Sequence, residues 1–185
     1  MRETPDPSEL DNAISEDVRA GFYSRSDIIE RATDIFEVED QPPPANIAAR
    51  VDAALARQRA VQASWPSPTD CDRLDAAFGA LERSGITARQ NFSCCNTCGY
   101  SEIGAEMDDS GKRRGFAFFH MQDTSRAVDG MGVMLSYGAH DGTAGSGVAI
   151  GREIAAAIVC SMGHPTYSVI RYGYEDRSRA DARRT

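Results

Sequence analysis

The sequence predicts an α/β (or α+β) fold: a mixed, largely parallel four-stranded sheet with flanking helices, preceded by a three-helix N-terminal segment. Two observations lead to this expectation. Apolar residues recur at helical spacing through residues 8–68, whereas after residue 69 short strand-like runs alternate with helical ones. Alternating strands and helices imply crossover connections, and these place consecutive strands in parallel.

Composition is consistent with one globular core and a helical addition. The chain has 185 residues, of which 41% are apolar and 26% charged, as is usual for globular proteins. No run approaches the roughly 18 apolar residues of a membrane span, and the acidic N-terminus lacks the apolar core of a secretory signal. We therefore expect a cytoplasmic protein, in which structural disulfides are rare. The five cysteines, an odd number, also argue against full pairing.

Acidic charge is concentrated at the start of the chain. Residues 1–40 hold twelve Asp and Glu against four Arg, whereas residues 41–185 hold sixteen charges of each sign. Such an acidic segment repels phosphate backbones, which argues against nucleic-acid binding. No membrane partner is expected either. The acidic helices are instead candidates for contacting a protein partner of unknown identity.

The N-terminal part should be helical and should end at a proline-rich break. Residues 1–7 are expected to be disordered, and residues 8–68 to form the acidic helical segment. Its three helices are expected at Ser8 to about Phe22, from a cap at Ser24 or Ser26 to Phe36, and at about Ala45 to Ala63. Proline-rich stretches at 41–44 and 65–68 follow the second and third helices.

The α/β domain is expected at residues 69–173, with a tail at 174–185. Thr69 is a plausible N-cap for a helix that ends before Gly85, and Asp123 is a candidate cap for a short helix that ends at Gly130. A further helix is expected at 148–162, and a short one near 101–107. The expected strands are 86–91, 115–120, 133–137 and 167–172.

Three of the five cysteines fall within five residues, directly after the first expected strand. Cys95 and Cys98 have the Cys-x-x-Cys spacing that lets two thiolates bind one tetrahedral zinc. Cys94 could supply a third ligand, and Cys71, Cys160 or His120 could complete the set. If the first two strands are parallel, His120 lies at the same sheet edge as the cysteines. The ligands predicted for a structural zinc ion are Cys94, Cys95, Cys98 and His120.

Two other interpretations of the same residues stay open. A strand followed by Cys-x-x-Cys and a helix is the arrangement that lowers a thiol pKa, so Cys95 could attack and Cys98 resolve in a redox enzyme or sensor. Alternatively, the cysteines are only small side chains that pack in a turn. The glycine-rich residues 138–147 match neither dinucleotide nor P-loop patterns and are interpreted as a flexible connection. The sequence does not decide whether the protein is an enzyme.

Several segments resemble an uncharacterised family of bacterial domains of unknown function. The similarity covers most of the chain, and its most specific part is the pattern N-F-[ST]-C-C-x-x-C-G followed by F-H-x-Q-D-T. The segments that carry the resemblance are Gly21–Arg25, Arg73–Phe78, Asn91–Gly99, Phe119–Thr124 and Tyr137–Gly138. The resemblance implies a bacterial origin and one architecture, and it assigns no catalytic residue. Together with the cysteine cluster, it favours a non-enzymatic binding or interaction domain.

Overall fold

The computed structural model describes residues 7–34, 45–106, 113–140 and 144–162. The chain divides into two compact units, Met1–Ser67 and Pro68–Thr185. Each unit has an apolar core of its own. The fourth strand expected at 167–172 and the tail at 174–185 lie outside the described residues. Of the segment 1–7, only Pro7 is described, and it begins a helix.

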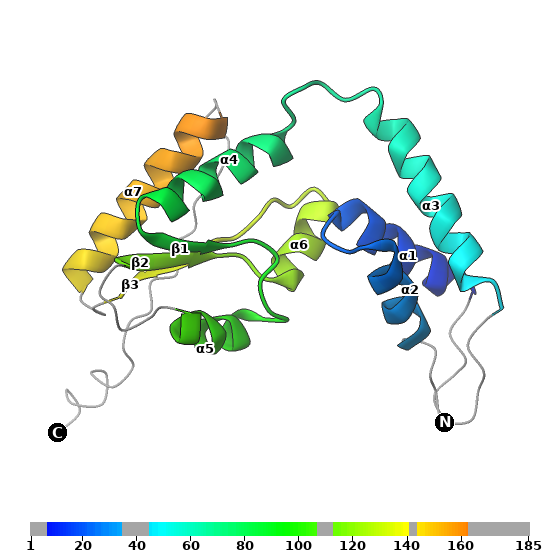
Figure 1. Cartoon of the computed structure of the whole chain (residues 1–185), viewed down its shortest axis with the longest axis horizontal. Helices are drawn as coiled ribbons and strands as arrows, with labels where there is room; N and C mark the ends of the chain where they lie inside the picture. The colour runs from blue at the N-terminus through cyan, green and yellow to red at the C-terminus, as the bar shows by residue number, and fades with distance from the viewer. Residues whose placement is uncertain (1–6, 35–44, 107–112, 141–143, 163–185) are drawn as a thin grey trace. The chain divides into compact units, whose positions relative to one another are not determined.

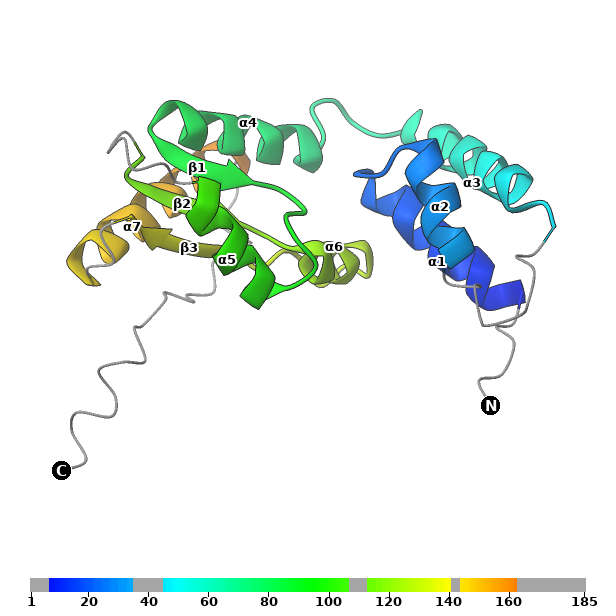
Figure 2. The same ribbon diagram turned by 60° about the horizontal axis from the view of Figure 1, so that its bottom comes forward.

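The first unit contains three helices among its described residues: α1 (Pro7–Ala20), α2 (Arg25–Asp34) and α3 (Ile47–Gln62). Figure 2 shows α1, α2 and α3 packed against one another. Their apolar residues recur three or four positions apart and therefore share one side of each helix. The buried core consists of Leu10, Ile14, Val18, Ile28, Ala32, Ile47, Val51 and Ala54. Exposed ion pairs such as Arg25 with Asp52 join the helices and add little to stability.

The second unit is built on a mixed sheet with three strands in the described residues, in the order β1-β2-β3. These are β1 (Ile86–Arg89), β2 (Gly115–Phe118) and β3 (Ser136–Ala139). β1 runs parallel to β2, with Ile86 opposite Gly115. β3 is antiparallel to β2, with Ser136 opposite Phe118. The parallel pair settles a question that the sequence leaves open.

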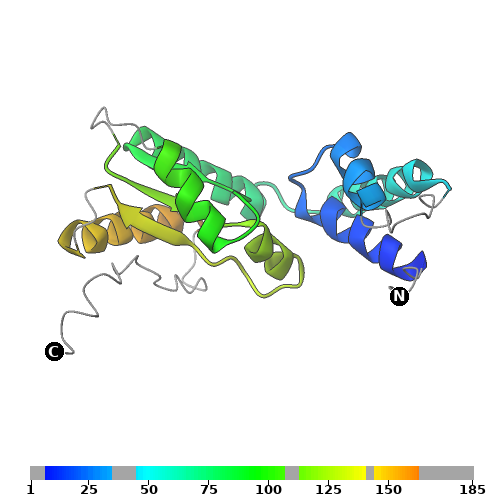
Figure 3. The same ribbon diagram turned by 90° about the horizontal axis from the view of Figure 1, so that it is seen from below.

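Helices cover both faces of this sheet. α4 (Asp70–Arg83) and α7 (Ala144–Met162) lie on one face, and α5 (Asn96–Glu106) lies on the other (Figure 1). Figure 3 views the unit from the α5 side, with α5 drawn in green. The core beneath α4 and α7 includes Phe78, Leu81, Ile86, Phe119, Ile154 and Ile158. The core beneath α5 is aromatic and is formed by Ile103, Phe116 and Phe118.

Several expected boundaries differ from the structure: β1 ends at Arg89 instead of 91, β2 ends at Phe118 instead of 120, and α5 begins at Asn96 instead of near 101. β3 begins at Ser136 instead of 133, because β2 ends at Phe118 and offers no further partner to the apolar residues before Ser136. α7 begins at Ala144 instead of 148, so the last part of the glycine-rich segment 138–147 is helical and not a flexible connection. Residues 141–143 lie outside the described residues. None of the helices in the described ranges has the length and apolar character needed to cross a membrane.

Candidate functional site

The loop that joins β1 to α5 is backbone-strained and held by side chains from other elements. Asn91 and Ser93 have φ angles of 49° and 62°, in the left-handed region that residues other than glycine rarely adopt. Thr124 donates a hydrogen bond to Asn91 Oδ1 at 2.7 Å, and Ser93 Oγ donates to Glu102 Oε1 at 3.0 Å. Strain of this kind persists only where the surrounding structure enforces it, and it is common at functional sites.

Backbone hydrogen bonds fix the same loop to the end of β2 and to the next helix, α6 (Met121–Val128). The Phe92 amide donates to the Phe119 carbonyl at 2.8 Å, and the Met121 amide donates to the Ser93 carbonyl at 3.1 Å. The loop thereby follows the carboxyl end of the parallel pair β1 and β2, which is the edge where α/β sheets bind ligands. Cys94 directly follows Ser93, so these hydrogen bonds to the end of β2 and to α6 also restrict the position of Cys94.

The first turn of α5 lies unusually close to the sheet. A Cβ atom at Gly99 would be 2.5 Å from the Phe118 ring, so only glycine permits this approach. The Ser136 hydroxyl donates to Asn96 Oδ1 at 2.7 Å and connects the same turn to β3. Because Cys98 lies in this turn, its position is fixed relative to the strands.

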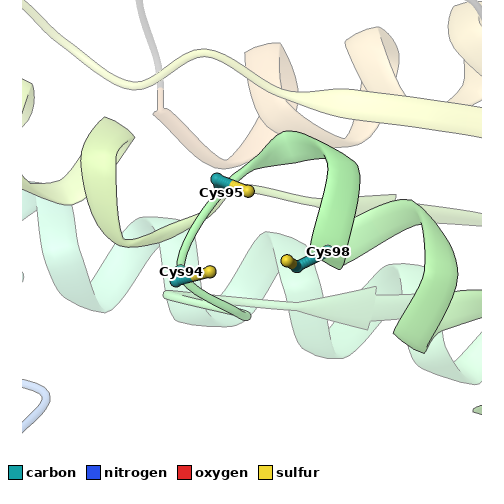
Figure 4. A group of neighbouring side chains, drawn as sticks. All are labelled: Cys94, Cys95 and Cys98. Atoms are coloured by element: carbon teal, nitrogen blue, oxygen red, sulfur yellow. The ribbon is translucent and has the colours of Figure 1, made fainter.

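The loop and the helix turn bring three cysteines together. The sulfur atoms of Cys94, Cys95 and Cys98 all lie within 4.8 Å of one another, and they are the one such group of candidate metal ligands in the described part of the chain. Figure 4 shows the three side chains converging from the loop and from the start of α5. Cys94 is exposed, and the other two are half-buried. Cys71 and Cys160 are exposed and lie outside the group.

The pKa values of Cys95 and Cys98 are shifted in opposite directions. Cys95 directly precedes α5, and the hydrogen bond from the Cys98 backbone amide, helped by the Cys98 thiol, holds the pKa of Cys95 below its ordinary value. Hydrogen bonds with the Cys94 and Cys95 sulfurs, together with their negative charge, raise the pKa of Cys98 to about 11. This is the effect of a helix N-terminus on the first thiol and of a neighbouring thiolate on the second. Cys95 therefore ionises more easily than Cys98.

His120, predicted as the fourth ligand, lies outside the three-sulfur group. It is the N-cap of α6: its Nδ1 accepts a hydrogen bond from the Asp123 amide at 3.3 Å, and the Asp123 carboxylate accepts one from the His120 amide at 3.2 Å. The capping residue is thus His120, and Asp123, which the sequence suggested as the cap, is the third helical residue. Nε2 is the ring nitrogen of His120 that this cap leaves for a ligand.

A small pocket lies at the same edge of the sheet, next to the start of α5. It has a volume of about 200 Å³, and its lining residues are Asn96, His120, Asp123, Met134, Leu135 and Ser136. Asp123 is buried at 4% exposure, and its carboxylate and amide both take part in the reciprocal cap with His120. The pocket therefore has a polar wall formed by the N-termini of α5 and α6.

Sequence reasoning missed the residues that support the cysteines. Asn91 had a weak signal, because asparagine adopts the left-handed conformation more readily than other non-glycine residues. No local pattern in the sequence pointed to Ser93 or Ser136. The Ser136–Asn96 contact spans 40 residues of sequence, and such a pairing depends on the fold and not on local spacing.

Comparison with known families gives a match over most of the chain. The profile of a family described as "Domain of unknown function (DUF6891)" matches residues 4–160, which is most of the chain and covers both units. Searches of curated proteins and of solved structures give no match. The geometry of the site is therefore the basis on which a function can be assigned.

Proposed function

The chain belongs to the DUF6891 family, whose description names no activity, and we propose from its cysteine geometry that it is a metal-binding protein with zinc as the ion. The observation that carries this proposal is the group of three sulfur atoms within 4.8 Å of one another. Tetrahedral zinc with Zn–S bonds of about 2.3 Å requires sulfurs about 3.8 Å apart, so binding would need a contraction of about 1 Å at most.

The surroundings of the cysteines support the proposal. The strained loop at Asn91 and Ser93 and the close approach at Gly99 hold the three sulfurs together before any ion binds. A preorganised site loses less conformational entropy on binding. The lowered pKa of Cys95 also favours the thiolate, which is the form that binds metals.

The three cysteines leave one of the four coordination positions of zinc to another ligand. His120 remains the protein candidate through Nε2, because its Nδ1 caps α6. A water molecule or an added ligand could take the position instead, since Cys94 is exposed. Closed four-ligand sites are typical of structural zinc, and three-ligand sites are typical of zinc that reacts or exchanges.

We also propose the wider role that the sequence analysis favours. A non-enzymatic binding or interaction protein of a bacterial cytoplasm would use the cluster to hold its metal. Its acidic N-terminal helices would contact a protein partner. The proposed contact with a protein partner is supported by the acidic charge of residues 1–40, which hold twelve Asp and Glu against four Arg.

A second function is favoured by the acidity of Cys95. In a thiol–disulfide exchange, the Cys95 thiolate would attack a disulfide sulfur of a substrate protein and release one of its thiols. Cys98 would then attack the mixed disulfide, which leaves Cys95 and Cys98 oxidised to a disulfide and the substrate reduced to two thiols. The lowered pKa of Cys95 and the hydrogen bond between the two sulfurs suit this sequence of steps.

One experiment separates the two functions. Protein purified without chelator or added metal is analysed for metal content and for free thiols, as the wild type and as single serine variants. We expect about one zinc per chain, lost in the Cys94→Ser, Cys95→Ser and Cys98→Ser variants and kept in the Cys71→Ser and Cys160→Ser controls. Absence of metal, with rapid oxidation that joins Cys95 to Cys98, would support the redox function and refute the metal site.

The same experiment tests His120. A His120→Ala variant that loses zinc together with the cysteine variants would make His120 the fourth ligand. Retention of about one zinc per chain would leave the fourth position to solvent or to an added ligand.

A further inference from the structure

We infer that the three-cysteine cluster accepts trivalent, three-coordinate ions, of which arsenic(III) supplied as arsenite is the probe. The sulfurs of Cys94, Cys95 and Cys98 would be its only protein ligands. This inference rests on the metal-binding function proposed above and names a further class of ion that the same three sulfurs can bind.

The number of donors is the first support. The group of candidate ligands holds three thiols and neither a carboxylate nor an imidazole. His120 and Glu102 lie outside this group, and Glu102 already accepts a hydrogen bond from Ser93. Zinc requires a fourth ligand from elsewhere. An ion with three bonds and a lone pair on its open side needs none.

The position of the cluster gives the second support. Cys94 is exposed and none of the three cysteines is buried, so the group is accessible to solvent. A pyramidal ion bound to three sulfurs has one unbonded side, which an accessible site can leave to solvent. Thiolates are soft ligands, and they select soft ions over the oxygen-seeking ones.

Charge balance gives the third support. Three thiolates around a divalent ion have a net charge of −1, whereas three thiolates around a trivalent ion are neutral. The chain already has a formal net charge of −8, and Glu102 is hydrogen-bonded to Ser93, the residue before Cys94. A neutral complex adds no further negative charge to this surface.

The binding reaction balances without an oxidant or a reductant. Arsenite at neutral pH is the uncharged trihydroxide, and three thiols replace its three hydroxyl groups to give three As–S bonds and three water molecules. Each thiol proton leaves with one hydroxyl group as water, so atoms and charge balance.

The test uses the reduced, metal-free full-length protein, in which arsenite is titrated and free thiols are counted. We expect the five thiols of the wild type to fall by three at one arsenite per chain. The Cys94→Ser variant should bind arsenite at least about tenfold more weakly, because one of three bonds is lost. The Cys71→Ser and Cys160→Ser controls should bind as tightly as the wild type.

Phenylarsine oxide makes the test specific for three thiols. Its arsenic has one position blocked by carbon, so two thiols suffice and one water is released. Cys94→Ser keeps Cys95 and Cys98 and should bind this compound as tightly as the wild type does. Unchanged binding also shows that Cys95 and Cys98 are reduced and accessible in the variant.

The outcomes separate this inference from the metal-binding proposal. Binding of zinc with loss of fewer than three thiols to arsenite, or equal arsenite affinity in Cys94→Ser, would overturn the inference and leave the zinc site standing. Arsenite bound through three thiols without zinc would support the inference and replace zinc as the ion. Failure to bind either ion would overturn both.

Discussion

At the scale of single residues, the acidity of Cys95 has a direct consequence for its reactivity. Its lowered pKa means that the thiolate forms at a lower pH than in an ordinary cysteine, so alkylation of Cys95 should begin at lower pH. Cys71, although exposed as a residue, is the control, because partial desolvation of its thiol and the negative charge of the nearby Asp75 raise its pKa. Cys98, with a pKa of about 11, should react only at high pH. Peptide mapping after brief alkylation across a pH series measures all three, and equal profiles for Cys95 and Cys71 would contradict the expectation.

Gly99 is the residue that sets the distance between α5 and the sheet. In Gly99→Ala the new Cβ would meet the Phe118 ring at 2.5 Å, so the helix must shift, and we expect a loss of about 1–3 kcal/mol in the free energy of unfolding. Gly104 in the same helix has open space on its side-chain side, with no atom within 4 Å of where a Cβ would lie. Gly104→Ala should therefore stabilise by about 0.5–1 kcal/mol. Urea unfolding measures both variants.

Zinc affinity is a second property that should distinguish Gly99→Ala from Gly104→Ala. Gly99→Ala should weaken zinc binding because the turn that carries Cys98 moves, whereas Gly104→Ala should leave the affinity unchanged. If the two variants bind zinc equally, the close approach at Gly99 does not position the cysteines.

The sequence predicts the cysteines of the site better than it predicts the role of His120. The Cys-x-x-Cys spacing of Cys95 and Cys98 and the adjacent Cys94 sufficed to predict a three-cysteine cluster, because the three are neighbours in the chain and stay so in the fold. His120 is predicted as a ligand because it ends a strand at the same sheet edge as the cysteines. A shared edge does not specify the distance between His120 and the sulfurs. The use of His120 Nδ1 to cap α6 was not visible, since histidine is an unusual capping residue beside Asp123.

At the scale of elements, two capping boxes offer a matched comparison. Asp72 in α4 and Asp123 in α6 each accept a backbone hydrogen bond from the N-cap residue. Replacing either with alanine should cost about 0.5–2 kcal/mol of stability. Only Asp123→Ala should also change the surroundings of the cluster, because Asp123 orients His120 and α6 holds Ser93 through the Met121 amide.

Thiol reactivity measures that difference between the two caps. We expect faster alkylation of Cys94 and Cys95 in Asp123→Ala than in the wild type, and wild-type rates in Asp72→Ala. Equal rates in both variants would mean that the cap of α6 does not contribute to the site.

The elements themselves were predictable where a local signal exists. Thr69 followed by Asp72 is a complete capping box, and α4 begins where this pattern places it. The direction of β2 relative to β1 was not predictable, because the 24 residues between Asn91 and Phe116 allow either a crossover or a hairpin. The start of β3 depends on where β2 ends, which is a property of the sheet.

At the scale of the whole molecule, the separate cores predict separate responses to metal. The first unit has the core around Val51, and the second has the cores around Ile154 and Phe118. All three cysteines of the cluster belong to the second unit. An ion that binds only the folded state stabilises by about 2.7 kcal/mol at a hundredfold excess over its Kd, and any affinity for the unfolded chain reduces this.

Calorimetry of the full chain tests this expectation. We expect zinc to raise the unfolding temperature of one transition and to leave the other in place, because stabilisation is confined to the unit that binds the ion. Val51→Ala removes buried apolar volume from the first unit and should lower the transition that zinc does not move. Cys98→Ser should abolish the zinc effect without changing that transition. A single transition that shifts with zinc and with Val51→Ala alike would show that the two units unfold together, and the cluster would then stabilise the whole chain.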